Sequence, residues 1–190
     1  SDDHRPLPLA ELQAMVSTLH NEFNFSVFRG ALPPSRVSVS WNARLLTTAG
    51  KTTFHAASNT TTVELSTKVV TTPYRLKKTL LHELIHAAVF LIDEDRKAPA
   101  HGALFKAWAR RADAIRKDMS PVTTKHSFAV HRACRFECAS CGAVFARHSK
   151  SIDTNRSRCG GCHGRLAYVG RVREGDAAAT VRKPKPPTAF

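Results

Sequence analysis

The pentapeptide His82-Glu83-Leu84-Ile85-His86 restricts the fold of this 190-residue chain more than any other segment. Around it, apolar residues recur at helical spacing from Leu76 to Leu91, and Pro73 suits the first turn of a helix. Residues four positions apart lie on one face of a helix, so the two imidazoles point in the same direction. The sequence therefore predicts a helix that begins at Pro73 and ends before the acidic residues 93–95.

This HExxH pattern indicates a metal-dependent hydrolase. His82 and His86 can both bind one Zn²⁺ ion, and Glu83 lies about 100° around the helix, within reach of a water on the metal. With Glu83 as the general base, such a water can attack a carbonyl carbon, which is the chemistry of peptide-bond hydrolysis. The alternative is a pair of buried, hydrogen-bonded histidines with no metal. That arrangement would desolvate three polar side chains on one turn, so the metal interpretation is preferred.

A catalytic zinc site needs a third protein ligand and keeps one position open. In the metzincin pattern this ligand comes six residues after the second histidine, where this chain has Ile92, so that pattern is excluded. The remaining candidates are one histidine and four acidic residues, namely His101, Asp93, Glu94, Asp95 and Asp113. His101 is favoured because it begins a new helix after a turn, and Gly102 beside it allows close backbone approach. A helix-loop-helix return would bring His101 over the metal.

Two cysteine pairs form a second strong pattern. Cys138-xx-Cys141 and Cys159-xx-Cys162 are separated by 17 residues, within the ~15–20 expected between the two halves of a four-thiolate zinc site. We therefore predict a closed, structural zinc ribbon in a reducing compartment. A redox-active dithiol is the alternative, but the ribbon spacing needs no redox partner to explain it. Cys134 remains outside both pairs.

The remaining periodicities predict an α+β fold. Apolar residues on one face predict a helix over 9–23, and a similar pattern predicts a helix over 102–117. Alternation of apolar and polar residues predicts strands over 37–41 and 62–66, which we expect to form a small antiparallel sheet.

Composition changes after Pro121, where helical periodicity disappears and β-forming residues, paired cysteines and basic residues dominate. We therefore predict a metalloprotease domain over 6–125 and a four-Cys zinc ribbon over 126–173. Residues 174–190 are basic and Pro-rich and cannot bury a core, so they are predicted to be a disordered tail.

The charge of the chain favours an anionic partner. Lys and Arg number 29 against 15 Asp and Glu, which gives a formal net charge of +14. From Arg132 to the C-terminus there are twelve basic and four acidic residues. A basic field concentrates polyphosphates, so we expect nucleic acid rather than a membrane as the partner. No apolar run approaches the ~18 residues that span a bilayer, which excludes a transmembrane protein.

Four basic residues of the cysteine-containing region are candidates for contacts to nucleic-acid phosphates: Arg147, Lys150, Arg156 and Arg158. The alternative is an ordinary solvated surface, because aromatic residues are not interleaved with these cations.

The motif His82-Glu83-xx-His86, followed by His101-Gly102-xx-Phe105, resembles the SprT-like metalloproteases, a group that contains Spartan and the germ cell nuclear acidic peptidases. The segments Trp41-Asn42-Ala43-Arg44 and Thr48-Ala49-Gly50 resemble the strand and turn that precede the helix in that family. Between the cysteine pairs, Lys150-Ser151-Ile152-Asp153-Thr154 is similar to the ribbon of the germ cell nuclear acidic peptidases and favours them over Spartan.

The resemblance implies a zincin-like SprT domain in which His82, His86 and His101 hold the catalytic zinc. It further implies a nuclear, DNA-dependent protease that cleaves proteins covalently crosslinked to DNA, with the ribbon binding single-stranded or junction DNA. Two other functions stay open. One is a nucleic-acid-binding module with a non-proteolytic scaffold role, which the intact Glu83 disfavours. The other is a zinc peptidase that acts on free proteins.

Overall fold

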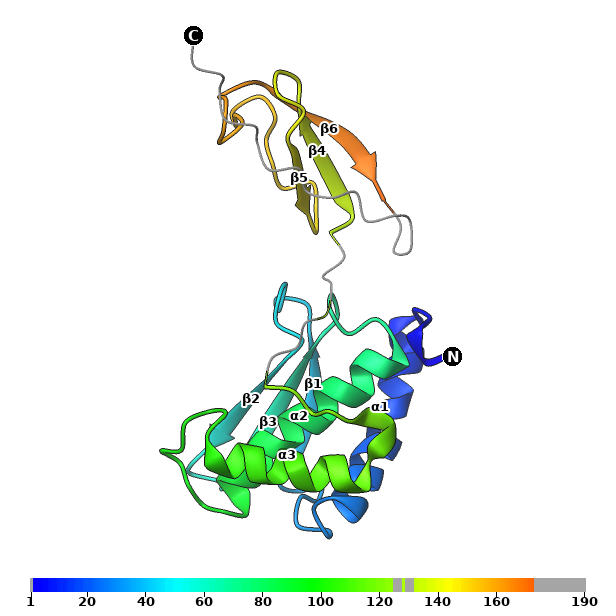
Figure 1. Ribbon diagram of the computed structural model, residues 1–190, viewed down its shortest axis with the longest axis vertical. Coiled ribbons are helices and arrows are strands. Elements are labelled where there is room, and N and C mark those ends of the chain that lie inside the picture. Colours follow the sequence, from blue (N-terminus) through cyan, green and yellow to red (C-terminus); the bar gives the residue numbers. More distant parts are fainter. Residues whose placement is uncertain (1, 125–127, 129–131, 173–190) are drawn as a thin grey trace. The chain divides into compact units, whose positions relative to one another are not determined.

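A computed structural model describes residues 2–124, 128 and 132–172 of the chain (Figure 1). The chain divides into two compact units, Ser1–Val130 and His131–Phe190. The predicted domain boundary at 125/126 and the predicted tail over 174–190 lie outside the described residues. Within the described part, no helix combines the length and the apolar character needed to cross a membrane.

The first unit combines a three-stranded sheet with three α-helices. Its strands are β1 (Val37–Asn42), β2 (Gly50–His55) and β3 (Thr60–Ser66), in the order β1-β3-β2. The sheet is mixed rather than wholly antiparallel as expected, because β1 runs parallel to β3 while β2 pairs with β3 in a hairpin. Residues 43–49 carry the chain past the end of β3, which lets β1 and β2 flank it.

The helices begin and end close to their predicted positions. They are α1 (Leu9–Ser26), α2 (Pro73–Leu91) and α3 (Ala103–Ile115), with short 3₁₀ turns η1 (Asp2–His4) and η2 (Lys117–Met119). Thr72 caps α2, because its Oγ1 accepts a hydrogen bond from the backbone N–H of Arg75 at 3.2 Å, and Pro73 occupies the first turn.

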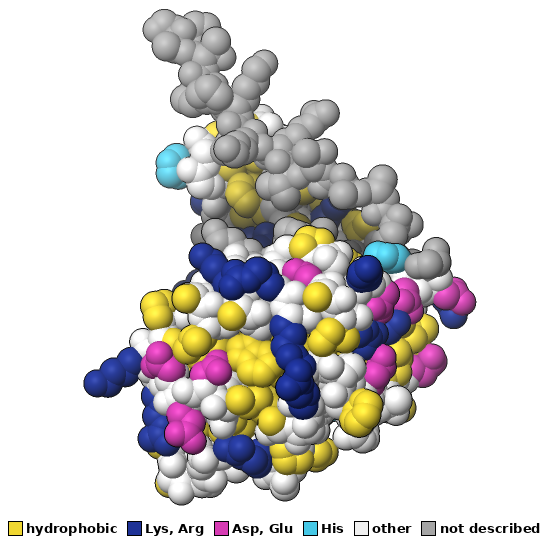
Figure 2. Space-filling model, turned by 60° about the horizontal axis from the view of Figure 1, so that its bottom comes forward, with side chains coloured by type: hydrophobic (Ala, Val, Ile, Leu, Met, Phe, Trp, Pro, Cys, Tyr) yellow, Lys and Arg dark blue, Asp and Glu magenta, His cyan; other side chains and the backbone are white. Residues whose placement is uncertain are grey.

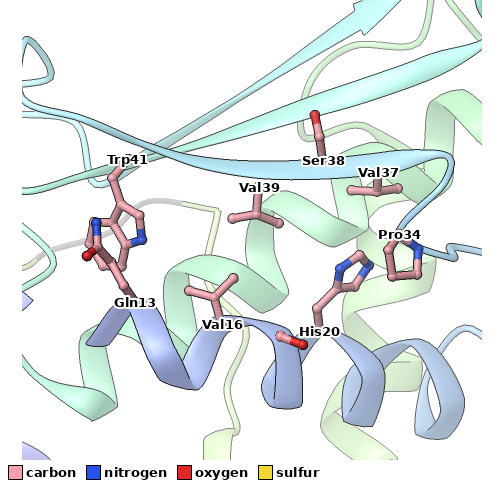
Figure 3. A pocket seen from close by; sticks show the side chains of 9 residues that line it. Gln13, Val16, His20, Pro34, Val37, Ser38, Val39 and Trp41 are labelled. Carbon is pink, nitrogen blue, oxygen red and sulfur yellow. The ribbon is translucent and has the colours of Figure 1, made fainter. Parts of the chain in front are cut away.

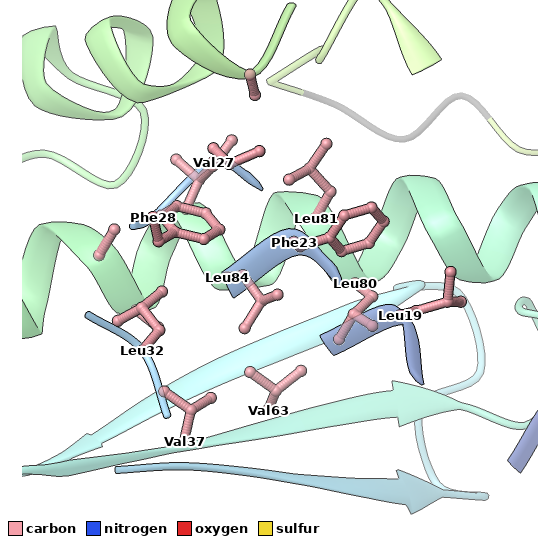
Figure 4. Packing of buried hydrophobic residues seen from close by; sticks show 14 of the residues in the cluster. Leu19, Phe23, Val27, Phe28, Leu32, Val37, Val63, Leu80, Leu81 and Leu84 are labelled. Carbon is pink, nitrogen blue, oxygen red and sulfur yellow. The ribbon is translucent and has the colours of Figure 1, made fainter. Parts of the chain in front are cut away.

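Helix α2 is the centre of the first unit. It packs against β2, β3, α1 and α3, and it buries residues on nearly every side, as expected for a helix that is covered all round. Figure 4 shows Leu80 and Leu84 of α2 directed toward Val63 on the sheet, with Phe23 of α1 in the same core cluster. The predicted HExxH helix is therefore a rigid, buried scaffold.

The second unit is a small antiparallel sheet with two cysteine loops. Its strands are β4 (Cys134–Cys138), β5 (Val144–Arg147) and β6 (Leu166–Arg171), in the order β5-β4-β6. Both pairings are antiparallel, and the β4·β6 register shifts between Arg135 and Phe136. The α+β fold and the β-rich cysteine region agree with the sequence prediction.

Candidate active site and metal centres

Three predicted histidines converge in the first unit. His82 and His86 project from one face of α2, and His101 lies just before α3. The Nε2 atom of His82 lies 3.2 Å from the Nε2 atoms of both His86 and His101. This arrangement brings three imidazole nitrogens to one point.

The hydrogen bond on the other side of His82 defines the role of its ring. Its Nδ1 lies 2.9 Å from the carbonyl oxygen of Thr123. A carbonyl oxygen only accepts hydrogen bonds, so Nδ1 carries the proton, and in the neutral ring Nε2 keeps its lone pair. Three nitrogens bound to one tetrahedral zinc at ~2.0–2.1 Å are separated by about 3.3–3.4 Å, close to the separation in this cluster. The donor set therefore fits a zinc ion. Burial also lowers the pKa of His101, which favours the neutral imidazole that metal binding requires.

Glu83 is buried between α2 and the sheet, with 4% of its surface exposed. Thr52 on β2 donates a hydrogen bond to its Oε2 at 2.7 Å. Burial raises the pKa of the Glu83 carboxyl to about 7, and the Thr52 hydrogen bond opposes this shift. A carboxyl group with this pKa can accept and release a proton near neutral pH.

The chain passes very close to Glu83 at Gly50, the first residue of β2. A Cβ atom at this position would lie 2.8 Å from Cγ and Oε1 of Glu83 and 2.8 Å from Cγ2 of Thr79. Only glycine fits this space, so the Thr48-Ala49-Gly50 segment singled out in the sequence forms one wall around the carboxylate.

The histidines and Glu83 open onto a cleft of about 640 Å³. One wall is the segment 47–52, and the other includes Phe90, Arg96 and Ala100. The guanidinium carbon of Arg96 lies 4.9 Å from the centre of the Phe54 ring, and the Phe54 ring contacts the ring of Phe90. Sequence reasoning missed Thr52, Phe90 and Arg96. Thr52 lies on a strand that the apolar pattern did not reveal, and Phe90 and Arg96 come close to the site only when the chain folds.

The acidic alternatives for a third ligand are engaged elsewhere or exposed. Asp93 accepts a hydrogen bond from the indole N–H of Trp108 at 2.8 Å, and Asp95 accepts one from the backbone N–H of Lys97. Asp113 accepts a hydrogen bond from the backbone N–H of Val122 at 2.8 Å. Of the described residues at this cleft, only His82, His86 and His101 form a group that could hold a metal ion.

The four paired cysteines form a second group in the other unit. All four are free thiols whose sulfur atoms lie within 4.8 Å of one another. The Sγ of Cys138 lies 3.4 Å from that of Cys162, and the Sγ of Cys141 lies 3.7 Å from that of Cys159. Each contact joins a cysteine of one CxxC motif to a cysteine of the other. This arrangement fits a shared metal better than a dithiol within one motif. Four sulfurs at ~2.3 Å from one zinc would be about 3.8 Å apart.

The pKa is lowered for two of the four thiols, Cys138 and Cys159, whereas it is raised for Cys141 and raised to about 12 for Cys162. The backbone N–H of Cys141 lowers the pKa of the Cys138 thiol to about 6, and that of Gly161 lowers the pKa of Cys159. Gly164 is needed here, because a Cβ atom would lie 2.9 Å from the Sγ of Cys138 and would collide with Ser140. This donor set also fits zinc.

The four predicted nucleic-acid contacts, Arg147, Lys150, Arg156 and Arg158, are all exposed. None of them forms an ion pair with another described residue, although Arg147 and Arg158 donate hydrogen bonds to nearby backbone carbonyls. The ammonium of Lys150 lies 4.8 Å from the ring centre of Tyr168, an aromatic neighbour that sequence reasoning missed. By contrast, Figure 2 shows Lys and Arg scattered among acidic and apolar side chains on the visible face of the first unit.

A second cavity, of about 440 Å³, lies between α1 and β1 (Figure 3). Val16 and His20 line it from the helix, and Val39 and Trp41 line it from the strand. The imidazole of His20 is buried, with Nε2 2.9 Å from the carbonyl oxygen of Leu32. This cavity shares no lining residue with the histidine cleft, and we assign it no part in the candidate active site.

Comparison with known proteins agrees with this geometry. The model of the SprT-like family matches residues 15–126, which include all three histidines and Glu83. The chain belongs to the SprT-like family. Germ cell nuclear acidic-1 protein of Caenorhabditis elegans is 35% identical over 157 residues, or 82% of this chain. This alignment is longer than the family match, so the similarity extends beyond the SprT-like segment.

Two further relatives of this SprT-like chain are human and murine. Germ cell nuclear acidic protein of Homo sapiens is 29% identical over 82% of the chain. DNA-dependent metalloprotease SPRTN of Mus musculus is 29% identical over 93% of it. The chain spans 29% of the worm protein, 23% of the human protein and 30% of the murine protein, so it corresponds to less than a third of each.

Proposed function

We propose that this chain is a zinc metalloendopeptidase whose zinc is held by His82, His86 and His101. The observation that carries the proposal is the convergence of three imidazole nitrogens and a buried carboxylate on one open cleft. Zinc, when bound, polarises a peptide carbonyl and makes water a stronger acid.

The side chains of the chain itself supply the proton transfers. Glu83 takes a proton from the attacking water and then delivers it to the leaving amine. The hydroxyl of Thr52 holds the carboxylate of Glu83 through its 2.7 Å hydrogen bond. The carbonyl of Thr123 fixes the His82 ring with its Nε2 lone pair toward the other histidines.

We further propose that the cysteine region is a zinc ribbon that binds DNA and that the substrates are proteins crosslinked to DNA. Cys138, Cys141, Cys159 and Cys162 would hold a structural zinc, which makes two zinc ions per chain. Eight Lys and Arg against two Asp and Glu lie within residues 132–172, and the four candidate contacts are exposed. The name of the SPRTN relatives as DNA-dependent metalloproteases supports this assignment.

DNA binding would bring the protease to its substrate. A protein attached to the same DNA is met at an effective concentration of about mM for short connections, far above that of a dilute free protein. On this proposal, residues 6–125 cut, residues 126–173 bind single-stranded or junction DNA, and the tail follows at 174–190. Such a substrate places the protein in the nucleus, as the names of the germ cell nuclear acidic relatives also suggest.

The experiment compares cleavage of a DNA-crosslinked protein with cleavage of the same protein free in solution. Each substrate is tested without DNA and with single-stranded, double-stranded or junction DNA. We expect DNA-stimulated cleavage of the crosslinked protein, and none by Glu83→Gln, which keeps the size of the side chain but removes the base. Equal cleavage of the free protein without DNA would indicate a general peptidase. DNA binding without cleavage under any of these conditions would indicate a scaffold.

A further inference from the structure

Residues 119–124, here called the exit strap, leave the helices of the first unit and run past the histidine cluster. Met119 anchors the strap in the core with 2% of its surface exposed, and Val122 packs against the same core. At its far end, Thr124 lines the catalytic cleft. The strap therefore connects the packed interior of the unit to the wall of the candidate active site.

Two charged side chains hold the strap in place. The ammonium of Lys78 donates hydrogen bonds to the carbonyl oxygens of Met119 and Pro121, both at 2.6 Å. The carboxylate of Asp113 on α3 accepts the backbone N–H of Val122 at 2.8 Å. Burial lowers the pKa of Lys78 while the charge of Asp113 opposes this shift, as expected if the two groups lie near each other.

Thr123, the next residue after Val122, contacts the histidine cluster. The carbonyl oxygen of Thr123 accepts the Nδ1 proton of His82. Lys78 lies four residues before His82 on α2, so the two side chains occupy the same helix face one turn apart. The same face of α2 therefore carries Lys78, which binds the strap, and His82, whose ring the strap orients.

One described residue beyond the exit strap, Phe128, also contacts α2. Phe128 contacts the ring of Tyr74, and the guanidinium of Arg75 lies 5.5 Å from the centre of the Phe128 ring. Both partners lie in the first turn of α2. The chain is therefore fixed to α2 on both sides of Thr123, at Lys78 and again at Tyr74.

We infer that Lys78 and Asp113 are positioning residues that act through the exit strap to fix the tautomer and orientation of His82. This inference rests on the proposed zinc site. The carbonyl of Thr123 selects the tautomer with the proton on Nδ1, in which the lone pair on Nε2 can bind a metal. A strap that moves away would remove this selection, and losing such an outer partner of a metal ligand typically weakens metal affinity by about 10–100-fold.

The test uses the full chain and four variants. Lys78→Met keeps the aliphatic stem and removes the two strap hydrogen bonds, while Lys77→Met is its matched control. Lys77 lies beside it on α2 but pairs with Asp3 at 2.7 Å and donates no hydrogen bond to a described residue of the strap. Asp113→Ala removes the acceptor for Val122, whereas Asp113→Asn keeps an oxygen that can accept the same N–H.

Two measurements separate positioning from general destabilisation. The ¹⁵N resonances of the His82 ring in zinc-free protein report its tautomer, and the same resonances during zinc titration against a competing chelator report affinity at this site alone. We expect Lys78→Met and Asp113→Ala to populate both tautomers and to bind zinc about 10–100-fold more weakly. Lys77→Met and Asp113→Asn should match the unmodified chain in both measurements.

The inference is overturned if Lys78→Met keeps the tautomer and zinc affinity of Lys77→Met. If Lys78→Met does not fold, the comparison of Asp113→Ala with Asp113→Asn decides, and equal values for that pair also overturn it. The proposed function fails in a different way, namely when the unmodified chain binds no zinc at the histidines. The tautomer measurement in zinc-free protein then still tests the strap.

Discussion

The close approach of Gly50 to Glu83 leads to a quantitative prediction for Gly50→Ala. The added Cβ would lie 2.8 Å from two Glu83 atoms and from the Cγ2 of Thr79. Carbon atoms in contact prefer about 3.5–4.0 Å, so each pair must separate by about 0.7 Å or more. Both neighbours belong to the buried helix α2, so β2, Glu83 or both must move.

This displacement has two expected effects. Overpacking of a tight core costs about 1–3 kcal/mol in the free energy of unfolding. A shift of about 1 Å in a catalytic group can cost ~100-fold in rate, so we expect cleavage to fall by about two orders of magnitude. None of the three atoms nearest to this Cβ is a histidine nitrogen, so we expect zinc content to stay unchanged.

The second collision partner allows the two effects to be separated. Thr79→Ser removes the Cγ2 methyl group but leaves Glu83 in place. In the double variant Gly50→Ala/Thr79→Ser, we expect part of the lost stability to return while cleavage stays low. Denaturant midpoints measure stability, single-turnover cleavage of a DNA-crosslinked protein measures the rate, and metal analysis measures zinc.

Gly160→Ala is a suitable control, because no atom lies within 4 Å of a Cβ at that position. It should leave cleavage and stability unchanged. The reasoning fails if Gly50→Ala cleaves at the rate of the unmodified chain. It also fails if the double variant recovers cleavage together with stability, because the rate loss would then come from packing and not from Glu83.

Three further predictions follow from the site and the ribbon. Thr52→Val should lower the turnover rate with little change in substrate affinity while Thr52→Ser should keep it, and a steady-state comparison of the two checks whether the hydroxyl holds Glu83. Removing zinc with a chelator should unfold the cysteine unit but leave the helical signal of the first unit in circular dichroism. Replacing the four exposed cations by Ala should weaken DNA binding and reduce its salt dependence by up to about one counterion per lost phosphate contact; an unchanged salt slope in a titration would contradict this. The four cations replaced in this variant are Arg147, Lys150, Arg156 and Arg158.

The parts of the site that depend on short sequence spacing could be predicted. The HExxH residues lie on one helix because apolar residues at helical spacing surround them, and the structure places that helix at Pro73–Leu91. Each CxxC motif brings two sulfurs together locally, and the fold then brings the two motifs to each other, with Cys138 beside Cys162 and Cys141 beside Cys159. His101 was favoured over the acidic candidates by the turn that precedes it, and it is the residue that the structure brings to the cluster.

The parts that depend on distant contacts could not be predicted. Strand β2 is mostly polar, so its sequence shows no clear apolar alternation, and Thr52 reaches Glu83 only because the hairpin places it there. Thr123 approaches His82 across 41 positions of sequence. Leu9, expected on the buried face of α1, is 40% exposed because the helix begins there. Periodicity identifies a helix face but not where the core ends.

The two candidate zinc sites have different relations to the fold. Among the described residues, the core cluster of the first unit contains large apolar side chains from all three α-helices and the sheet, and Phe23 and Leu80 are completely buried. The corresponding cluster of the second unit has four buried members, Cys138, Cys159, Ala143 and Leu166, and two of these are candidate ligands. Outside this cluster, Phe136 and Cys134 are also buried in the second unit.

A core this small offsets little of the conformational entropy of its chain, so we expect a metal held by the four thiolates to supply much of the folding free energy. In the first unit the apolar core suffices, and a bound zinc adds only its mass-action contribution, about 2.7 kcal/mol at a free concentration 100 times its dissociation constant. The histidine site can therefore exchange or lose its metal without loss of the scaffold. We expect the cysteine site not to tolerate this loss. If the proposed function holds, DNA binding through the ribbon should then depend on zinc through folding, and proteolysis should depend on zinc through chemistry.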